Sequence, residues 1–239
     1  MRVLIVNTSE RTGGAAVAAN RLKDALNKSG IDASMLVRDK LSDDKTVFAI
    51  KNNWCTRWNK LWERWCIFCH LRFSKRNLFA IDIANTGTDI TKLPEFKNAD
   101  VIHLAWINQG FISLNNIEKI LKAGKPLVWT MHDIWPATAI CHITLACRKF
   151  ETQCEKCRLL PFPFGCDLAK RTWRRKEQIK GHSHIIYIAC SKWLQNEAKK
   201  SALIGMNVIE SIPNPIDTNI FCKTNKNEAR KKLGLPTDK

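Results

Sequence analysis

Short apolar runs and amphipathic stretches alternate along most of the chain. Residues 2–7 (RVLIVN) are apolar enough to form a buried strand, and residues 15–30 repeat apolar side chains at helical spacing before the chain reaches Gly30. The alternation continues with predicted strands at 32–39, 45–50, 99–107, 125–133, 184–190 and 207–217, and with predicted helices at 114–124 and 191–205. Strands that alternate with helices favour parallel pairing. We therefore predict an α/β fold, a Rossmann-like parallel sheet with helices on both faces.

The alternation ends at a proline-bracketed stretch, IPNPIDTNIF (212–221), which is followed by a short charged helix within 225–239. A proline-rich exit of this kind is typical of a domain boundary. We expect one domain over residues 1–212, and we interpret residues 213–239 as a linker.

Tryptophan and basic residues dominate the segment 54–77, which is predicted to be helical. Its apolar residues fall near helical spacing on one side: Trp54, Trp58, Leu61, Trp62, Trp65, Phe68 and Cys69. Its cations are Arg57, Lys60, Arg64, Arg72, Lys75 and Arg76. Such a basic amphipathic helix either lies on an anionic membrane surface or packs its tryptophans on the domain or on a neighbouring one.

The composition narrows the class of protein. The 239 residues are 45% hydrophobic, enough for a full core, and 39 Lys and Arg against 22 Asp and Glu give a net charge of +17. This charge implies an anionic partner: nucleic acid, a membrane surface or a phosphorylated substrate. The sequence has neither a long apolar run nor a signal-peptide pattern, so we expect a cytoplasmic protein, peripheral at the inner face of the cell membrane if the tryptophan-rich helix binds lipid.

The chain has ten cysteines, and five of them lie in the loop 141–166. The first four lie within 17 residues and end in a C-x-x-C pair, and His142 is a possible substitute ligand. The four are Cys141, Cys147, Cys154 and Cys157, and Cys166 follows. Thiolates at this spacing are candidates for a structural zinc site, and free or disulfide-paired thiols are the alternative.

One predicted strand, Leu127–Met131, runs directly into His132 and Asp133. The strand before it ends near His103 and Trp106. Open α/β sheets bind ligands at the carboxyl ends of their strands, so these residues are candidates for one site. Imidazole can donate a hydrogen bond to a sugar hydroxyl, and a nearby carboxylate can orient it. A turn that merely caps the next segment is the alternative.

A glycine pair, Gly13-Gly14, separates the first strand from the first helix. Glycines at this position let backbone N–H groups approach a phosphate, and the helix N-terminus adds partial positive charge. The surrounding TGGAAVAAN does not fit the G-x-G-x-x-G fingerprint, which disfavours a nicotinamide cofactor. The pair is either a phosphate-binding turn or an ordinary loop.

Together these motifs resemble a known family. The succession DVIHLAWINQGF, KPLVWTMHDIWPATAICH, the C-x-x-C loop, IACSKWLQNEAKKS and IPNPIDTNIF is similar to the N-terminal, acceptor-side domain of glycosyltransferase family 4-like enzymes of the GT-B fold. The similarity is strongest to the bacterial branch that builds surface polysaccharide, and it covers most of residues 1–222. It is weakest in the tryptophan-rich segment.

The resemblance implies the N-terminal half of a retaining glycosyltransferase. Such an enzyme transfers a sugar from a nucleotide-sugar to a glycan or lipid-linked glycan acceptor and has no obligatory cofactor. Residues 213–239 would then lead to a donor-binding domain that the 239 residues do not include, so we expect little or no activity from this chain alone. The implied catalytic residues are His132 and Asp133, and the implied substrate-binding residues are Gly13, Gly14, His103, Trp106 and Trp135.

The alternative of a different class is a basic, zinc-stabilised nucleic-acid-binding module. The net charge and the cysteine cluster favour it. The sequence has neither a recognition helix nor an aromatic RNA-binding strand, so nucleic acid is the less favoured partner.

Overall fold

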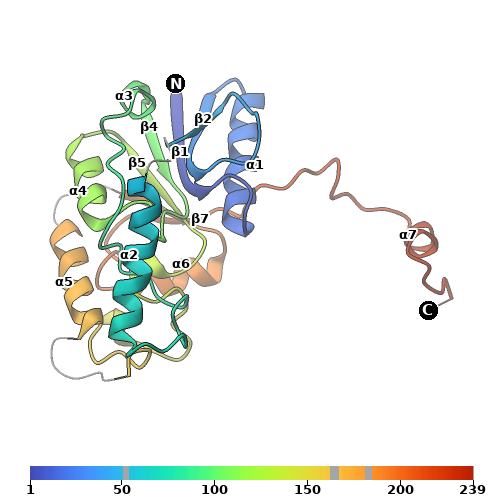
Figure 1. Ribbon diagram of the computed structural model, residues 1–239. Coiled ribbons are helices and arrows are strands. Elements are labelled where there is room, and N and C mark those ends of the chain that lie inside the picture. Colours follow the sequence, from blue (N-terminus) through green and yellow to red (C-terminus); the bar gives the residue numbers. More distant parts are fainter. Residues whose placement is uncertain (51–53, 162–166, 181–184, 239) are drawn as a thin grey trace.

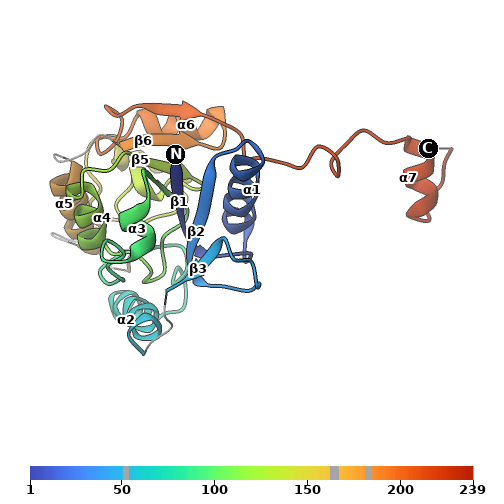
Figure 2. The same cartoon turned by 90° about the horizontal axis from the view of Figure 1, so that it is seen from above.

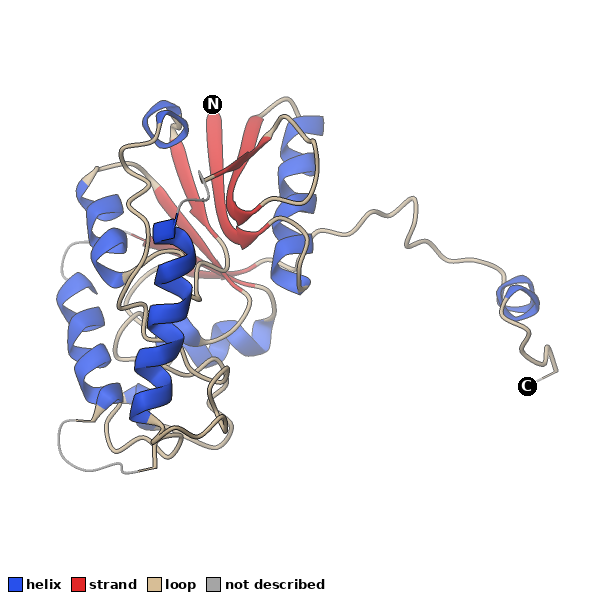
Figure 3. Cartoon of the chain, viewed as in Figure 1, coloured by secondary structure: helices blue, strands red, loops and turns tan. Residues whose placement is uncertain are grey.

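The computed structural model describes residues 1–50, 54–161, 167–180 and 185–238 (Figure 1). In this part of the chain, parallel strands form one seven-stranded sheet with the order β3-β2-β1-β4-β5-β6-β7. The strands are β1 (Arg2–Ser9), β2 (Asp32–Asp39), β3 (Val47–Ala49), β4 (Val101–Leu104), β5 (Leu127–Met131), β6 (Ile185–Ala189) and β7 (Ile209–Ser211). Figure 3 shows them gathered in a single layer. Each predicted strand is present, and the predicted α/β class is confirmed.

Helices cover both faces of the sheet, as predicted. The α-helices of the described residues are α1 (Gly14–Lys28), α2 (Trp54–His70), α3 (Pro94–Asn98), α4 (Leu114–Lys122), α5 (Leu168–Lys180), α6 (Lys192–Lys199) and α7 (Lys226–Lys232), of which α7 does not contact the sheet. Helix α1 lies on one face, and α4 and α5 lie on the other (Figures 1 and 2). The direction of the crossovers explains this division. The chain moves one way along the sheet from β1 to β2 and the opposite way from β4 to β7, and right-handed connections then fall on opposite faces.

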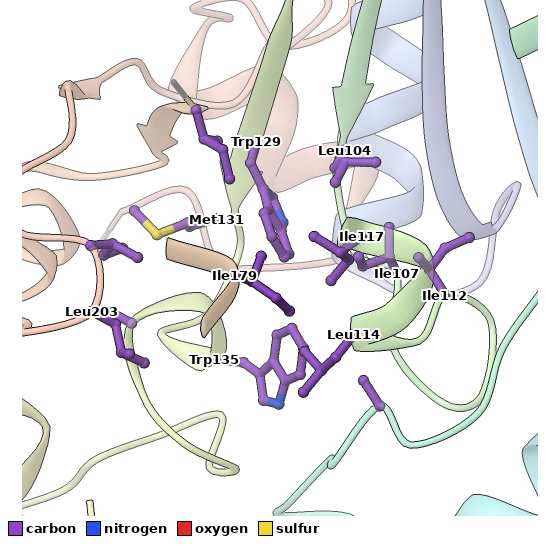
Figure 4. Close-up of a cluster of buried hydrophobic side chains, with 14 of the residues drawn as sticks. Leu104, Ile107, Ile112, Leu114, Ile117, Trp129, Met131, Trp135, Ile179 and Leu203 are labelled. Atoms are coloured by element: carbon purple, nitrogen blue, oxygen red, sulfur yellow. The ribbon is translucent and has the colours of Figure 1, made fainter. Parts of the chain in front are cut away.

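The core is formed mainly on the face that α4 and α5 cover. Leu4 and Val6 of β1 point into this large cluster, whereas Val3 and Ile5 pack against α1 in a smaller one. Both faces of β1 are therefore buried, which explains its continuous apolar run. Figure 4 shows the centre of the large cluster, where two tryptophans lie among aliphatic side chains of α4 and α5.

The tryptophan-rich segment forms α2, which is shorter than predicted because it ends at His70. Its buried residues are Thr56, Glu63 and Ile67, which lie on the side opposite the tryptophans. Trp54 is 88% exposed and Trp58 is 63% exposed. The interpretation in which the tryptophans pack on the domain is therefore wrong, because α2 turns its polar side inward.

The C-terminal segment leads to α7, which has no buried residue and stands apart from the sheet in both views (Figures 1 and 2). The domain boundary at residue 212 and the linker role of residues 213–239 stay predictions. In the described part of the chain, no helix combines the length and hydrophobicity that crossing a bilayer requires.

Gly110 holds the loop after β4 against α2, and its replacement tests that contact. A Cβ at Gly110 would lie 2.6 Å from the backbone carbonyl of Asn59, and φ there is +70°. Gly124 has the same conformation, φ +71°, with open space around it. We expect Gly124→Ala to lower the free energy of unfolding by about 1 kcal/mol through strain alone. Gly110→Ala should lower the free energy of unfolding by at least about 1 kcal/mol more than Gly124→Ala does, because of the clash with Asn59.

Urea unfolding of the two variants measures this difference. Equal losses of stability would mean that the loop and α2 are not in tight contact.

Candidate active-site cleft

A cleft of about 550 Å³ opens at the carboxyl ends of β1, β2, β4 and β5. This is the edge at which open parallel sheets bind ligands. Five of the seven residues predicted for catalysis or substrate binding line it together: Gly13, Gly14, Trp106, His132 and Asp133. The two others, His103 and Trp135, lie elsewhere.

The N-terminus of α1 forms one wall of the cleft. Gly13 precedes the first helical residue with φ 91°, a conformation that favours glycine. No side chain caps this helix end, and its first turn carries no acidic residue. The first backbone N–H groups therefore face the cleft, and the helix dipole adds partial positive charge there. Lys60 of α2 lines the same cleft. This wall is suited to an anion.

Buried polar side chains at the end of β1 set the floor of the cleft. The Asn7 side-chain oxygen accepts a hydrogen bond from the Trp106 backbone N–H at 2.8 Å, and the Thr8 hydroxyl donates to the Trp106 carbonyl at 2.9 Å. These bonds join the end of β1 to the loop after β4. Sequence reasoning missed both residues. The available signal was the switch from an apolar run to Asn7 and Thr8 at a strand end.

Asp133 orients the aromatic wall of the cleft. One carboxylate oxygen accepts from the Trp106 indole N–H at 3.0 Å and lies 2.8 Å from His142 Nδ1. The other accepts from the Trp135 backbone N–H at 2.9 Å. Burial raises the pKa of this carboxyl, but these hydrogen bonds and the His142 ring outweigh it, so its pKa lies below the ordinary value. Asp133 thus bonds to His142 and Trp106 rather than orienting His132.

His142 connects Asp133 to a second carboxylate, that of the buried Asp82. Its Nε2 lies 2.6 Å from Asp82 Oδ2, and Asp82 also pairs with Arg64 of α2. Both ring nitrogens of His142 are therefore occupied by carboxylates, which leaves neither for the metal-ligand role considered from the sequence. The network runs from α2 to the cleft, and sequence reasoning missed Asp82 and Arg64 as its members.

His132 follows β5 and lines the cleft directly. Burial lowers the pKa of its imidazole, while the Asp133 carboxylate acts in the opposite direction. An imidazole whose pKa is lowered is neutral at neutral pH, so one ring nitrogen donates and the other accepts.

His103 lies deeper than predicted. It is buried on β4, with Nε2 2.7 Å from the Thr130 hydroxyl, and burial, followed by the neighbouring His132, lowers its pKa to about 4. It lines a second, apolar hollow of about 360 Å³ beside α1, which His132 also reaches. The structure therefore does not place His103 in the first cleft, because its side chain points to the sheet face rather than past the strand end.

Trp135 belongs to the core. Its side chain is 1% exposed, its indole N–H donates to the Asp82 carbonyl at 2.8 Å, and its ring lies 6.2 Å from that of Trp129 (Figure 4). The predicted substrate contact is not possible from this position. The ring instead anchors the loop after β5.

Lys176 of α5 also contacts the loop after β5, and sequence reasoning did not identify it. Its ammonium donates to the carbonyls of Trp135 at 2.6 Å and Thr138 at 2.9 Å, and it lies over the Trp135 ring. Burial lowers the pKa of this lysine to about 7.

The structural zinc site in the cysteine loop stays a prediction. Cys141, Cys147, Cys154 and Cys157 are free and partly buried, and burial raises the pKa of Cys154 to about 12 and that of Cys157 to about 11. Among the described residues, no three His, Cys, Asp or Glu side chains are grouped so that they could hold a metal ion. The described thiols therefore do not by themselves fit a tetrahedral zinc site, and Cys166 lies outside the described residues.

Comparison with known proteins identifies the family of this chain. Residues 12–220 match the model of Glycosyltransferase Family 4, which is most of the chain. The chain therefore belongs to this family, and the predicted resemblance is confirmed.

A relative extends this result. Over 63 residues the chain is 40% identical to the putative colanic acid biosynthesis glycosyl transferase WcaC of Escherichia coli. The aligned part is 25% of this chain and spans 15% of the relative's length.

The buried Lys176 predicts a pH dependence of stability. Between about pH 7 and the ordinary lysine pKa of 10.5, the unfolded chain binds a proton that the folded chain lacks. The contribution of this group to the free energy of unfolding therefore rises with pH in that window and falls as the pH drops toward 7. Relative to Lys176→Met, the unmodified protein should gain about 1 kcal/mol from pH 7 to 8.

Urea unfolding at both pH values measures the gain, and Lys199→Met, at an exposed position of α6, is the control. The control should keep the pH slope of the unmodified protein. The same slope for Lys176→Met would show that Lys176 is charged in the folded state.

Proposed function

We propose that this protein is the acceptor-side half of a retaining glycosyltransferase in surface-polysaccharide synthesis. It would transfer a hexose from a nucleotide-sugar to a glycan or lipid-linked glycan. Family membership and the printed name of the relative support the class of reaction. The observation that carries the proposal is the cleft itself, where an uncapped helix N-terminus and the partly buried imidazole of His132 face the same space. Retention of configuration rests on the resemblance alone.

The two walls of the cleft suit the two charges that sugar transfer creates. As the bond from the anomeric carbon to the donor phosphate breaks, positive charge develops on the sugar and negative charge on the departing nucleoside diphosphate. The α1 N-terminus would stabilise the phosphate. His132 would hydrogen-bond to the sugar, and its neutral form leaves it free to donate to a hydroxyl.

Asp133 acts through Trp106 and the loop after β5 rather than on the substrate in this proposal. Its hydrogen bonds already occupy both carboxylate oxygens. A base of lowered pKa is also a weak proton acceptor, so positioning suits Asp133 better than general-base catalysis.

The cleft opens at a sheet edge, and in the GT-B arrangement a donor-binding domain faces it. We propose that residues 213–239 lead toward such a domain and that residues 1–239 alone bind the donor weakly. Rapid sugar transfer by the purified 239-residue chain would contradict this part of the proposal.

Ala15→Asp tests the phosphate-binding wall. Ala15 lies in the first turn of α1 and lines the cleft. A carboxylate there interacts favourably with the helix dipole, so the stability of the protein should be maintained. The same carboxylate would repel a bound phosphate. We expect the affinity for nucleoside diphosphates to fall about tenfold. NMR titration of backbone amides measures it, and shifts in the unmodified protein should centre on Gly13 and Gly14.

Ala25→Asp, an exposed position near the other end of α1, is the matched control. Equal affinities in the two variants would show that any phosphate binds elsewhere.

His132→Ala tests the sugar-facing wall. If the imidazole stabilises the reacting sugar, the substitution should lower kcat for sugar transfer about 100-fold with little change in KM. The assay is release of nucleoside diphosphate from nucleotide-sugars by the protein together with its donor-binding part. A change confined to KM would assign His132 to ground-state binding instead.

A further inference from the structure

Helix α2 is attached to the domain through Ile67, which is buried in the large hydrophobic cluster, and through polar contacts. The buried Glu63 carboxylate accepts hydrogen bonds from the backbone N–H groups of Ile83 at 3.0 Å and Ala84 at 2.6 Å. The Arg64 guanidinium donates to the Leu78 carbonyl at 2.7 Å and pairs with the buried Asp82. A buried carboxylate that lost these partners would be strongly destabilised, so the contacts fix which side of α2 faces inward.

The opposite side of α2 is aromatic and faces solvent. We define the aromatic face as Trp54, Trp58, Leu61, Trp62, Trp65 and Phe73, each of which is exposed. The rings contact one another: Trp58 stacks on Trp62 at 6.5 Å, and Trp65 lies 6.3 Å from Phe73. Monomeric proteins rarely leave a contiguous apolar patch of this kind in water unless it serves binding.

The charges around the aromatic face have one sign. Arg57, Lys75 and Arg76 are exposed beside it. Between residues 54 and 81 the single acidic residue is Glu63, which is buried. The exposed surface of this segment therefore offers aromatic rings and cations without carboxylates. Tryptophan prefers the lipid–water interface, and cations bind anionic headgroups.

We propose that the aromatic face of α2 docks this protein on an anionic lipid bilayer, with the helix lying in the plane of the interface. The tryptophans would enter the headgroup region, and the flanking cations would contact lipid phosphates. Charge complementarity selects this occupant over a protein partner, because an anionic bilayer offers an apolar interior beneath a uniformly negative surface. Neither the aromatic face nor its cations depend on the sugar-transfer proposal.

Docking through α2 would also place the cleft next to the membrane. Lys60 lies on α2 and lines the cleft, and the Arg64–Asp82–His142 contacts connect the same helix to Asp133. A cleft in this position suits an acceptor glycan that is carried on a lipid, and this part of the inference rests on the proposed function. The membrane inference itself is tested without any sugar transfer.

Vesicle flotation of the 239-residue chain tests the docking. We expect binding to vesicles of phosphatidylglycerol with phosphatidylcholine, weak binding to phosphatidylcholine alone, and release at high salt. The Trp58→Ser, Trp62→Ser double variant should partition at least about tenfold less. Trp193→Ser is the matched control, because Trp193 is 64% exposed on α6, outside the aromatic face. It should bind as the unmodified protein does.

A second variant probes the cations separately. Arg57→Gln, Lys75→Gln, Arg76→Gln should lower binding to the anionic vesicles and reduce its salt dependence, while circular dichroism and urea unfolding confirm that each variant is folded. Quenching of tryptophan fluorescence by brominated lipid should accompany binding and decrease in the tryptophan double variant, which keeps Trp54 and Trp65.

Several results would overturn the proposal. These are the absence of vesicle binding, equal binding by the double variant, or equal loss on Trp193→Ser. A dimer that the double variant abolishes, or tight oligonucleotide binding through the same residues without vesicle binding, would assign the aromatic face to another occupant. Failed nucleoside diphosphate binding with intact vesicle binding would count against the sugar-transfer proposal alone.

Discussion

Two carboxylates, the buried Asp82 and the partly buried Asp133, determine how the loops around the cleft are arranged. Charges removed from water must be paired inside the protein, and a buried pair that loses one partner costs about 3–5 kcal/mol. His142 lies between the two carboxylates and contacts both. Arg64 reaches Asp82 from α2, and the Trp106 indole reaches Asp133 from the loop after β4. One network therefore holds segments that are far apart in the sequence.

The cleft depends on this network for its shape and on the sheet for its position. The parallel strands bring the ends of β1, β4 and β5 to one edge, and the short loops after them carry Gly13, Trp106 and His132 into the same space. Two contacts anchor the loop after β5. The Trp135 ring is inserted in the core (Figure 4). The Lys176 ammonium donates to the Trp135 carbonyl. Trp135 thus supports the loop beside the cleft from within the core.

Helix α2 is also held by buried polar contacts, but its tryptophans remain exposed. An amphipathic helix ordinarily buries its apolar side, since this burial stabilises it. Here the carboxylate of Glu63 and the guanidinium of Arg64 take the inner side, and the tryptophans remain outside. The polar contacts and the close approach of Gly110 to Asn59 hold the helix, so its aromatic face is available for another partner.

The sequence by itself determined the sheet, because apolar runs that alternate with helical periods favour parallel strands whatever surrounds them. It also determined that Gly13, Trp106 and His132 would share the sheet edge, since each lies in or next to the loop that follows a strand. Periodicity showed that α2 has a tryptophan side, but not which way that side points.

Only the tertiary structure decided the rest. Whether a side chain near a strand end faces the cleft depends on its neighbours in space, which is why the sequence did not show that Trp135 lies in the core and that His103 lines a second hollow. The partners of Asp133 and Glu63 come from positions distant in the chain, and local pattern carries no information about such pairings. The orientation of α2 follows from those pairings, because buried charges are satisfied only in one arrangement of the folded chain.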